Sequence, residues 1–157
     1  MTFVVPQGGS SVCHIDLLPK KPSKGKAANW PMTDTSTEPA TVIDSFEVDF
    51  SKASSPQQRQ YERMIFVISI SEKANTAKQS WRFIENGVQF CPGHADYLDD
   101  MSTSVSDDGQ VLTCVIRSLT DTPEEVSFSF LAMRQDRKSG ECAIYASADP
   151  GGRFTRR

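Results

Sequence analysis

Hydrophobic and polar residues alternate along most of the chain after residue 45. Phe46, Val48 and Phe50 alternate with two acidic residues, which is typical of a strand with one face in solvent. Residues 64–70 are apolar on both faces and rich in β-branched side chains, which favours a central strand. Later segments alternate in the same way. The pattern places these large side chains in the core: Phe66, Ile68, Trp81, Phe128 and Phe130.

Two dipeptides predict tight turns between these strands. Asn86-Gly87 and Asp108-Gly109 both tolerate the positive φ values that two-residue hairpins require. We therefore expect one hairpin centred on each dipeptide.

Short strands separated by turns, without a convincing amphipathic helix, indicate an all-β fold. Only residues 55–63 and 72–80 have a composition that suits helical turns. The strands number about seven or eight and vary in length, which favours a sandwich over a barrel. The sequence thus predicts a two-sheet antiparallel β-sandwich of immunoglobulin or cupredoxin type.

The first part of the chain has a different composition. Residues 19–44 contain four prolines and a lysine-rich run, and hydrophobic residues make up only 38% of the whole chain. Such a stretch buries too little apolar surface to offset its ordering entropy. We expect residues 1–44 to form an extended or disordered segment that is dispensable for folding. Whether residues 12–18 form a strand is left undecided. Residues 45–157 would then form the β-sandwich domain.

Charge and hydropathy argue against some partners and locations of the protein. The net charge of −3 argues against nucleic-acid binding, and no apolar stretch reaches the ~18 residues of a membrane span. The basic groups at 20–26 and 153–157 are interpreted as solvated tails. Because the N-terminus lacks the features of a secretory signal, we expect a cytoplasmic protein with free thiols. Cys114 and Cys142 lie in apolar runs, where cysteine behaves as a small buried hydrophobe.

One segment has the residue types of a metal site. Cys91 and His94 have the spacing of a metal-ligand pair, and Cys13-His14 could supply a second pair for zinc. Adjacent residues on a strand point to opposite faces, however, which argues against the second pair. Carboxylates close to His94 suit calcium or magnesium, although their spacing does not match an EF-hand loop. They are Asp96, Asp99 and Asp100.

No convergent catalytic set accompanies these groups. The chain has only two histidines and lacks a nucleophile elbow, a P-loop and a dinucleotide-binding motif, so no cofactor is expected. We therefore expect a non-catalytic binding or assembly module with a protein partner. The alternative is a metal-binding protein or hydrolase that uses the Cys91–Asp100 loop. The segment around 126–132 carries only Ser127 and Ser129 on the face opposite its phenylalanines, without a charge. We expect a homodimer to form through this surface.

The second half of the chain resembles the bacterial DP-EP family, whose small proteins end in an Asp-Pro segment. The resemblance spans roughly residues 60–153. It implies a β-sandwich of cupredoxin or immunoglobulin type and implies no activity. A blue-copper site is not expected, because no His follows Cys142. The residues that carry the resemblance are Trp81-Arg-Phe83, Asn86-Gly87-Val88, Ser106-Asp-Asp108-Gly109, Val126-Ser-Phe128-Ser-Phe130, Gly140 and Ala148-Asp-Pro-Gly-Gly-Arg153.

Overall fold

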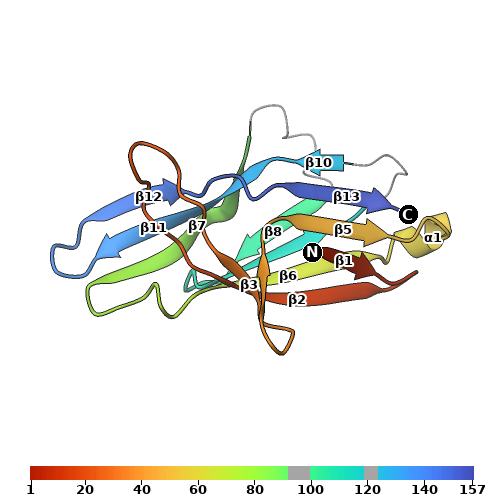
Figure 1. Ribbon diagram of the computed structural model, residues 1–157, viewed down its shortest axis with the longest axis horizontal. Coiled ribbons are helices and arrows are strands. Elements are labelled where there is room, and N and C mark those ends of the chain that lie inside the picture. Colours follow the sequence, from red (N-terminus) through yellow and green to blue (C-terminus); the bar gives the residue numbers. More distant parts are fainter. Residues whose placement is uncertain (92–99, 119–123) are drawn as a thin grey trace.

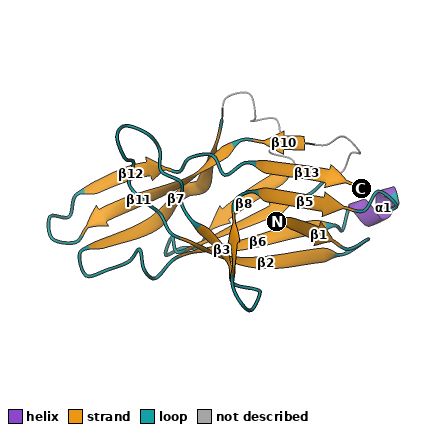
Figure 2. Ribbon diagram, viewed as in Figure 1, coloured by secondary structure: helices purple, strands orange, loops and turns teal. Residues whose placement is uncertain are grey.

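The protein is built almost entirely of β-strands in the computed structural model, which describes residues 1–91, 100–118 and 124–157 (Figures 1 and 2). The all-β prediction is confirmed. No helix among these residues is long and apolar enough to cross a membrane. The elements are β1 (Thr2–Val5), β2 (Ser10–Leu17), β3 (Met32–Asp34), β4 (Thr41–Ile43), β5 (Phe46–Phe50), α1 (Pro56–Arg59), β6 (Arg63–Ile70), β7 (Gln79–Phe90), β8 (Met101–Val105), β9 (Val111–Ile116), β10 (Glu124–Val126), β11 (Phe128–Asp136), β12 (Cys142–Ala146) and β13 (Gly152–Arg156).

The strands form three sheets that pack as a sandwich. A six-stranded sheet has the order β4-β3-β2-β6-β9-β8, a four-stranded sheet has the order β1-β5-β13-β10, and a three-stranded sheet has the order β12-β11-β7. Only Ser127 separates β10 from β11, so the chain passes directly between the two smaller sheets. Phe3 and Phe46 of the four-stranded sheet meet Phe66 of the six-stranded sheet, with ring centroids 4.8 and 4.9 Å apart. These contacts form the centre of the core.

The sheet arrangement differs from the two antiparallel sheets that the sequence predicts. The described residues contain thirteen strands, and β1–β5, β5–β13 and β2–β6 are parallel pairs. An alternating pattern locates a strand and its buried face, but it carries no information on the partner or its direction. The predicted core is confirmed nevertheless, because Phe66, Ile68, Trp81, Phe128 and Phe130 are all buried.

Residues 1–44 contribute strands to two of the three sheets, which differs from the expected extended segment. The strand expected at 12–18 is present as β2 and runs parallel to β6 along its whole length. β1 pairs with β5, while β3 and β4 extend the six-stranded sheet beyond β2. Four lysines and Pro22 lie in the exposed stretch 20–27, and this polar composition obscured the apolar strands on either side.

The Asn86-Gly87 dipeptide forms a bulge and not the expected hairpin. β7 continues through it, and the pairing with β11 shifts between Phe130 and Ala132. Glu85 and Gly87 have positive φ values of 51° and 74°. A side chain at Gly87 would lie 2.6 Å from a methyl carbon of Leu112, so the bulge packs tightly on β9. The Asp108-Gly109 turn joins β8 to β9 as predicted.

The C-terminal residues form a buried strand, which corrects the interpretation of a solvated basic tail. β13 lies between β5 and β10, with Phe154 completely buried. The Arg156 guanidinium, also buried, lies 2.7 Å from the Glu62 carboxylate and 5.3 Å from the Phe50 ring centroid. The lysines at 20–26 are exposed, as expected.

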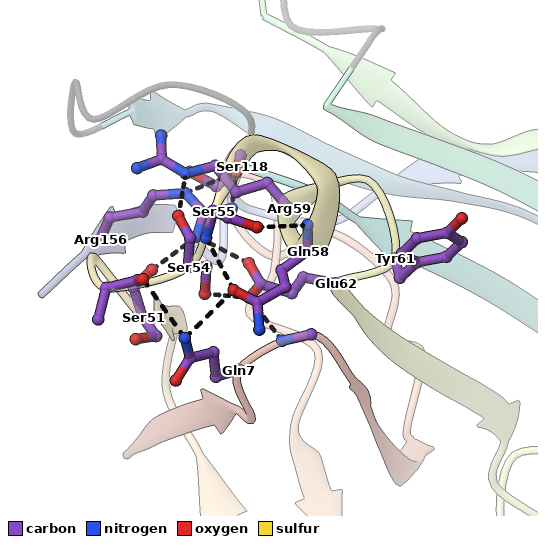
Figure 3. A network of polar contacts seen from close by, with 12 residues as sticks. Gln7, Ser51, Ser54, Ser55, Gln58, Arg59, Tyr61, Glu62, Ser118 and Arg156 are labelled. Atoms are coloured by element: carbon purple, nitrogen blue, oxygen red, sulfur yellow. Dashed lines mark hydrogen bonds and ion pairs between the residues drawn. The ribbon is translucent and has the colours of Figure 1, made fainter.

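The Glu62–Arg156 pair anchors several distant segments to one another (Figure 3). Arg156 donates to the backbone carbonyls of Ser51 and Ser118. Glu62 accepts from the Ser54 hydroxyl and, at 2.9 Å, from the Gly8 amide. These bonds satisfy most of the polar atoms of the ion pair, as a charged pair in a core requires.

Burial raises the pKa of Glu62, but the hydrogen bonds from Ser54, Gly8 and Arg156 and the positive charge of Arg156 outweigh it. The net result is a pKa below the ordinary value of 4.5. Glu62 is therefore ionised at neutral pH.

Candidate functional site

The Asp149-Pro150 turn joins β12 to β13 and is held in place by the Asp149 carboxylate. This carboxylate accepts hydrogen bonds from the Gly151 amide at 2.7 Å, the Phe128 amide at 3.3 Å and the Ser127 hydroxyl. Gly151 has a φ of 68°, a conformation that glycine adopts without strain. The side chain of Asp149 thus fixes the turn against the start of β11.

A cleft of 460 Å³ lies beside this turn. One wall is the segment 147–150, and the others come from residues 29–32 and 42–44. Its lining includes four buried apolar side chains, namely Trp30, Met32, Ile43 and Phe130. The cleft therefore combines segments from both ends of the chain over an apolar base.

Trp30 is fixed in orientation beneath the cleft. Its indole N–H donates to the carbonyl of Lys20 at 2.9 Å. Its ring stacks on Phe130, with centroids 6.5 Å apart, and meets Trp81 edge-on at 5.9 Å. Trp30 was not predicted as a site residue, because it lies in the polar N-terminal segment. A tryptophan in such a segment was the available signal, since large aromatic rings are mostly buried in folded proteins.

The rim of the cleft is polar and acidic. Asp44 is exposed, and its carboxylate makes no hydrogen bond or ion pair with the described residues. Val42, at the rim, is 65% exposed. Two backbone hydrogen bonds, from Leu18 to Pro31 and from Thr35 to His14, show that the odd-numbered residues of this segment face β2. The backbone groups of Met32 therefore face β4. By strand alternation, the N–H and C=O of Val42 point away from β3, and they have no partner among the residues that the structure describes.

Another hollow, of 310 Å³, shares Asp149 with this cleft. Its charged lining consists of Glu47, Glu125, Asp149 and Arg153. Within the described part of the chain, no group of three or more His, Cys, Asp or Glu residues is arranged to hold a metal ion. The acidic side chains here lend the region a negative potential only partly offset by Arg153.

The predicted metal loop is described only at its ends. The Cys91 amide donates to the carbonyl of Ser127, and the carbonyl of Asp100 accepts from the amide of Arg117. The candidate ligands between them, His94, Asp96 and Asp99, lie outside the described residues. A metal-binding or hydrolytic role for residues 91–100 therefore stays a prediction.

The other cysteines are placed by their strands. Cys13 is buried and its neighbour His14 is exposed, so the two lie on opposite faces of β2. Burial, with a hydrogen bond to the Asp34 carboxylate, raises the pKa of Cys13 to about 12, which disfavours the thiolate that a metal requires. Cys114 is buried as expected. Cys142 is exposed, which corrects the prediction, because its face of β12 is not covered.

Comparison with known proteins agrees with the resemblance noted above. A model of the DP-EP family matches residues 4–156. The match includes the N-terminal strands as well as the Asp149-Pro150 turn and both sides of the cleft. No curated protein shows significant similarity to the chain. Since the family model covers nearly all of its length, the chain belongs to the DP-EP family.

Proposed function

We propose that the protein is a non-catalytic binding module whose ligand occupies the cleft beside the Asp149-Pro150 turn. The observation that carries the proposal is the cleft itself, with its apolar base and acidic rim. Binding sites in proteins are commonly concave, largely apolar and equipped with a few polar groups that orient the ligand.

The chemistry of the cleft favours an extended peptide segment. The open N–H and C=O of Val42 offer the pairing that an added strand uses. The buried aromatic base favours an apolar side chain, and the carboxylate of Asp44, which has no partner in the described part of the chain, favours a Lys or Arg beside it. Asp149 adds negative charge at the rim, although its oxygens are engaged in the turn.

Peptide selection provides the test of this proposal. A library of random extended peptides displayed on phage should yield, on the wild-type protein, sequences that combine an apolar residue with Lys or Arg. An Asp44→Lys variant should lose these sequences, because it reverses the charge at the rim. Asp107→Lys makes the same charge change on the exposed turn between β8 and β9, outside the cleft lining, and should retain them. Enrichment of the same peptides on all three proteins, or of none on the wild type, would contradict binding in the cleft.

A further inference from the structure

β12 presents an open edge in the three-stranded sheet. The strand pairs with β11 on one side, with Gln135 opposite Cys142 and Leu131 opposite Ala146. Its other side has no partner strand among the described residues. This location differs from the homodimer surface that the sequence predicts around 126–132. There, β11 lies between β7 and β12, and the Ser127 hydroxyl is bound to Asp149.

The hydrogen bonds at the two ends of β12 define which backbone groups are open. The carbonyl of Glu141 accepts from Asp136, and the amide of Ser147 donates to Phe130, so odd-numbered residues face β11. By alternation, the N–H and C=O of the even-numbered residues point away from the sheet. They belong to Cys142, Ile144 and Ala146.

The open stretch has definite limits. Just beyond it, the amide of Ala148 donates to the carbonyl of Ala28, so the loop between β2 and β3 covers the edge there. At the other end, the chain enters the turn at 137–140. Figure 1 shows β12 at the margin of its sheet, with this loop crossing near its C-terminal end.

The edge lacks the usual protection against pairing. Natural edge strands carry charges, prolines or bulges that prevent association with other chains. No charged residue or proline occurs from Cys142 to Ala148, and Ile144 is 60% exposed. On the same outer face, Leu131 and Met133 of β11 are only half-buried, which extends the apolar surface beside the edge.

We propose that two copies of the protein associate through antiparallel pairing of their β12 strands about a two-fold axis at Ile144. In this register Ile144 faces Ile144 of the second copy, and Cys142 faces Ala146. All the open groups are then paired in about six hydrogen bonds, whereas a two-fold axis moved by one residue leaves some unpaired. The flanking acidic residue Glu141 lies opposite Ser147 of the second copy and not opposite another acidic residue. The strand is thus complementary to itself.

Sedimentation equilibrium of the full chain tests the association. The wild type should be a dimer in reversible equilibrium with the monomer. Ile144→Lys places two like charges opposite each other and should raise the dissociation constant by at least about tenfold. Val4→Lys is the matched control, because Val4 is also β-branched, 68% exposed and on an edge strand, β1, and it should leave the dimer intact. Equal melting behaviour of the variants establishes that both are folded.

A wild type that is monomeric at millimolar concentration would overturn the proposal, and so would an Ile144→Lys variant that remains a dimer. The register is tested separately by Ile144→Cys in a Cys142→Ser background, with oxidised glutathione as oxidant. Mass spectrometry should identify a disulfide that joins the two peptides carrying the thiol introduced at position 144. Ala143→Cys in the same background should not form the equivalent link, because in this register position 143 lies opposite Tyr145 of the second copy and not opposite its own counterpart. A dimer that links through position 143 and not through 144 would contradict the pairing.

Discussion

A chain that lacks residues 1–44 is expected not to fold. The deletion removes β2, the parallel neighbour of β6, and β1, the neighbour of β5. It also removes eight buried hydrophobic side chains. Burial of most of these side chains contributes about 1.5 kcal/mol or more each. Loss of all eight is therefore comparable with the whole free energy of unfolding of a typical domain, ~5–15 kcal/mol. These residues are Phe3, Val5, Cys13, Ile15, Leu17, Trp30, Met32 and Ile43.

Near-UV circular dichroism and a thermal melt of residues 45–157 measure this effect. We expect no fixed aromatic signal and no cooperative transition, together with aggregation through the exposed edge of β6, which is uncharged from Met64 to Ile70. As a control, replacing the exposed residues 21–26 of the full chain by a Gly-Ser segment of equal length should preserve the melt. A cooperative melt of residues 45–157 would show instead that this part is an independent domain.

Removal of the Arg156 side chain is expected to have the second largest effect. Arg156→Ala leaves the ionised Glu62 in the core without its partner, and breaking a buried pair in this way typically costs about 3–5 kcal/mol. The double change Glu62→Leu with Arg156→Met removes both charges and should recover much of that loss. Arg157→Ala, at the next residue, is the matched control. The Arg157 side chain is 67% exposed, and its guanidinium lies 3.6 Å from the Asp49 carboxylate. A surface pair of this kind contributes at most ~1 kcal/mol.

The same pair makes folding stability depend on pH. The pKa of Glu62 is lower in the folded chain than its ordinary value of 4.5. Its contribution is therefore fully present above that value and is lost as the pH falls through the lowered folded-state pKa. Urea unfolding at pH 7 and at successively lower pH should show a steeper loss of stability for the wild type than for the double variant. Parallel curves for the two proteins would mean that Glu62 does not titrate with unfolding.

The sequence located the central strands well because their signal is local. An alternation such as Phe46-Glu-Val48-Asp-Phe50 specifies both a strand and its buried face. The same argument applied to Phe154 and Arg156 would have placed both on one buried face of β13, but the terminal arginines suggested a solvated tail. The partner of Arg156 lies 94 residues earlier in the chain, at a separation that no local pattern reveals.

In the N-terminal segment, the overall composition hides the strands. Averaged over residues 1–44, prolines and lysines outweigh the apolar residues of β1 and β2, although these strands carry alternating burial of their own. The cleft was not predictable for a related reason. Its walls come from residues 29–32, 42–44 and 147–150, which only the folded sheets bring together. Asp149-Pro150 was recognised as a motif, but its place beside Trp30 depends on that assembly.

Binding in the cleft is tested most directly by amide chemical-shift mapping of the full-length protein. The titrant is the tightest-binding peptide selected on the wild type. We expect the perturbed signals to include the indole N–H of Trp30 and to be confined to residues 29–32, 42–44 and 147–150. The pattern should disappear in the Asp44→Lys variant and persist in Asp107→Lys. Perturbations at the opposite end of the sandwich, around Gly8 and Gln58, with none at Trp30 or Asp44, would contradict the proposed site.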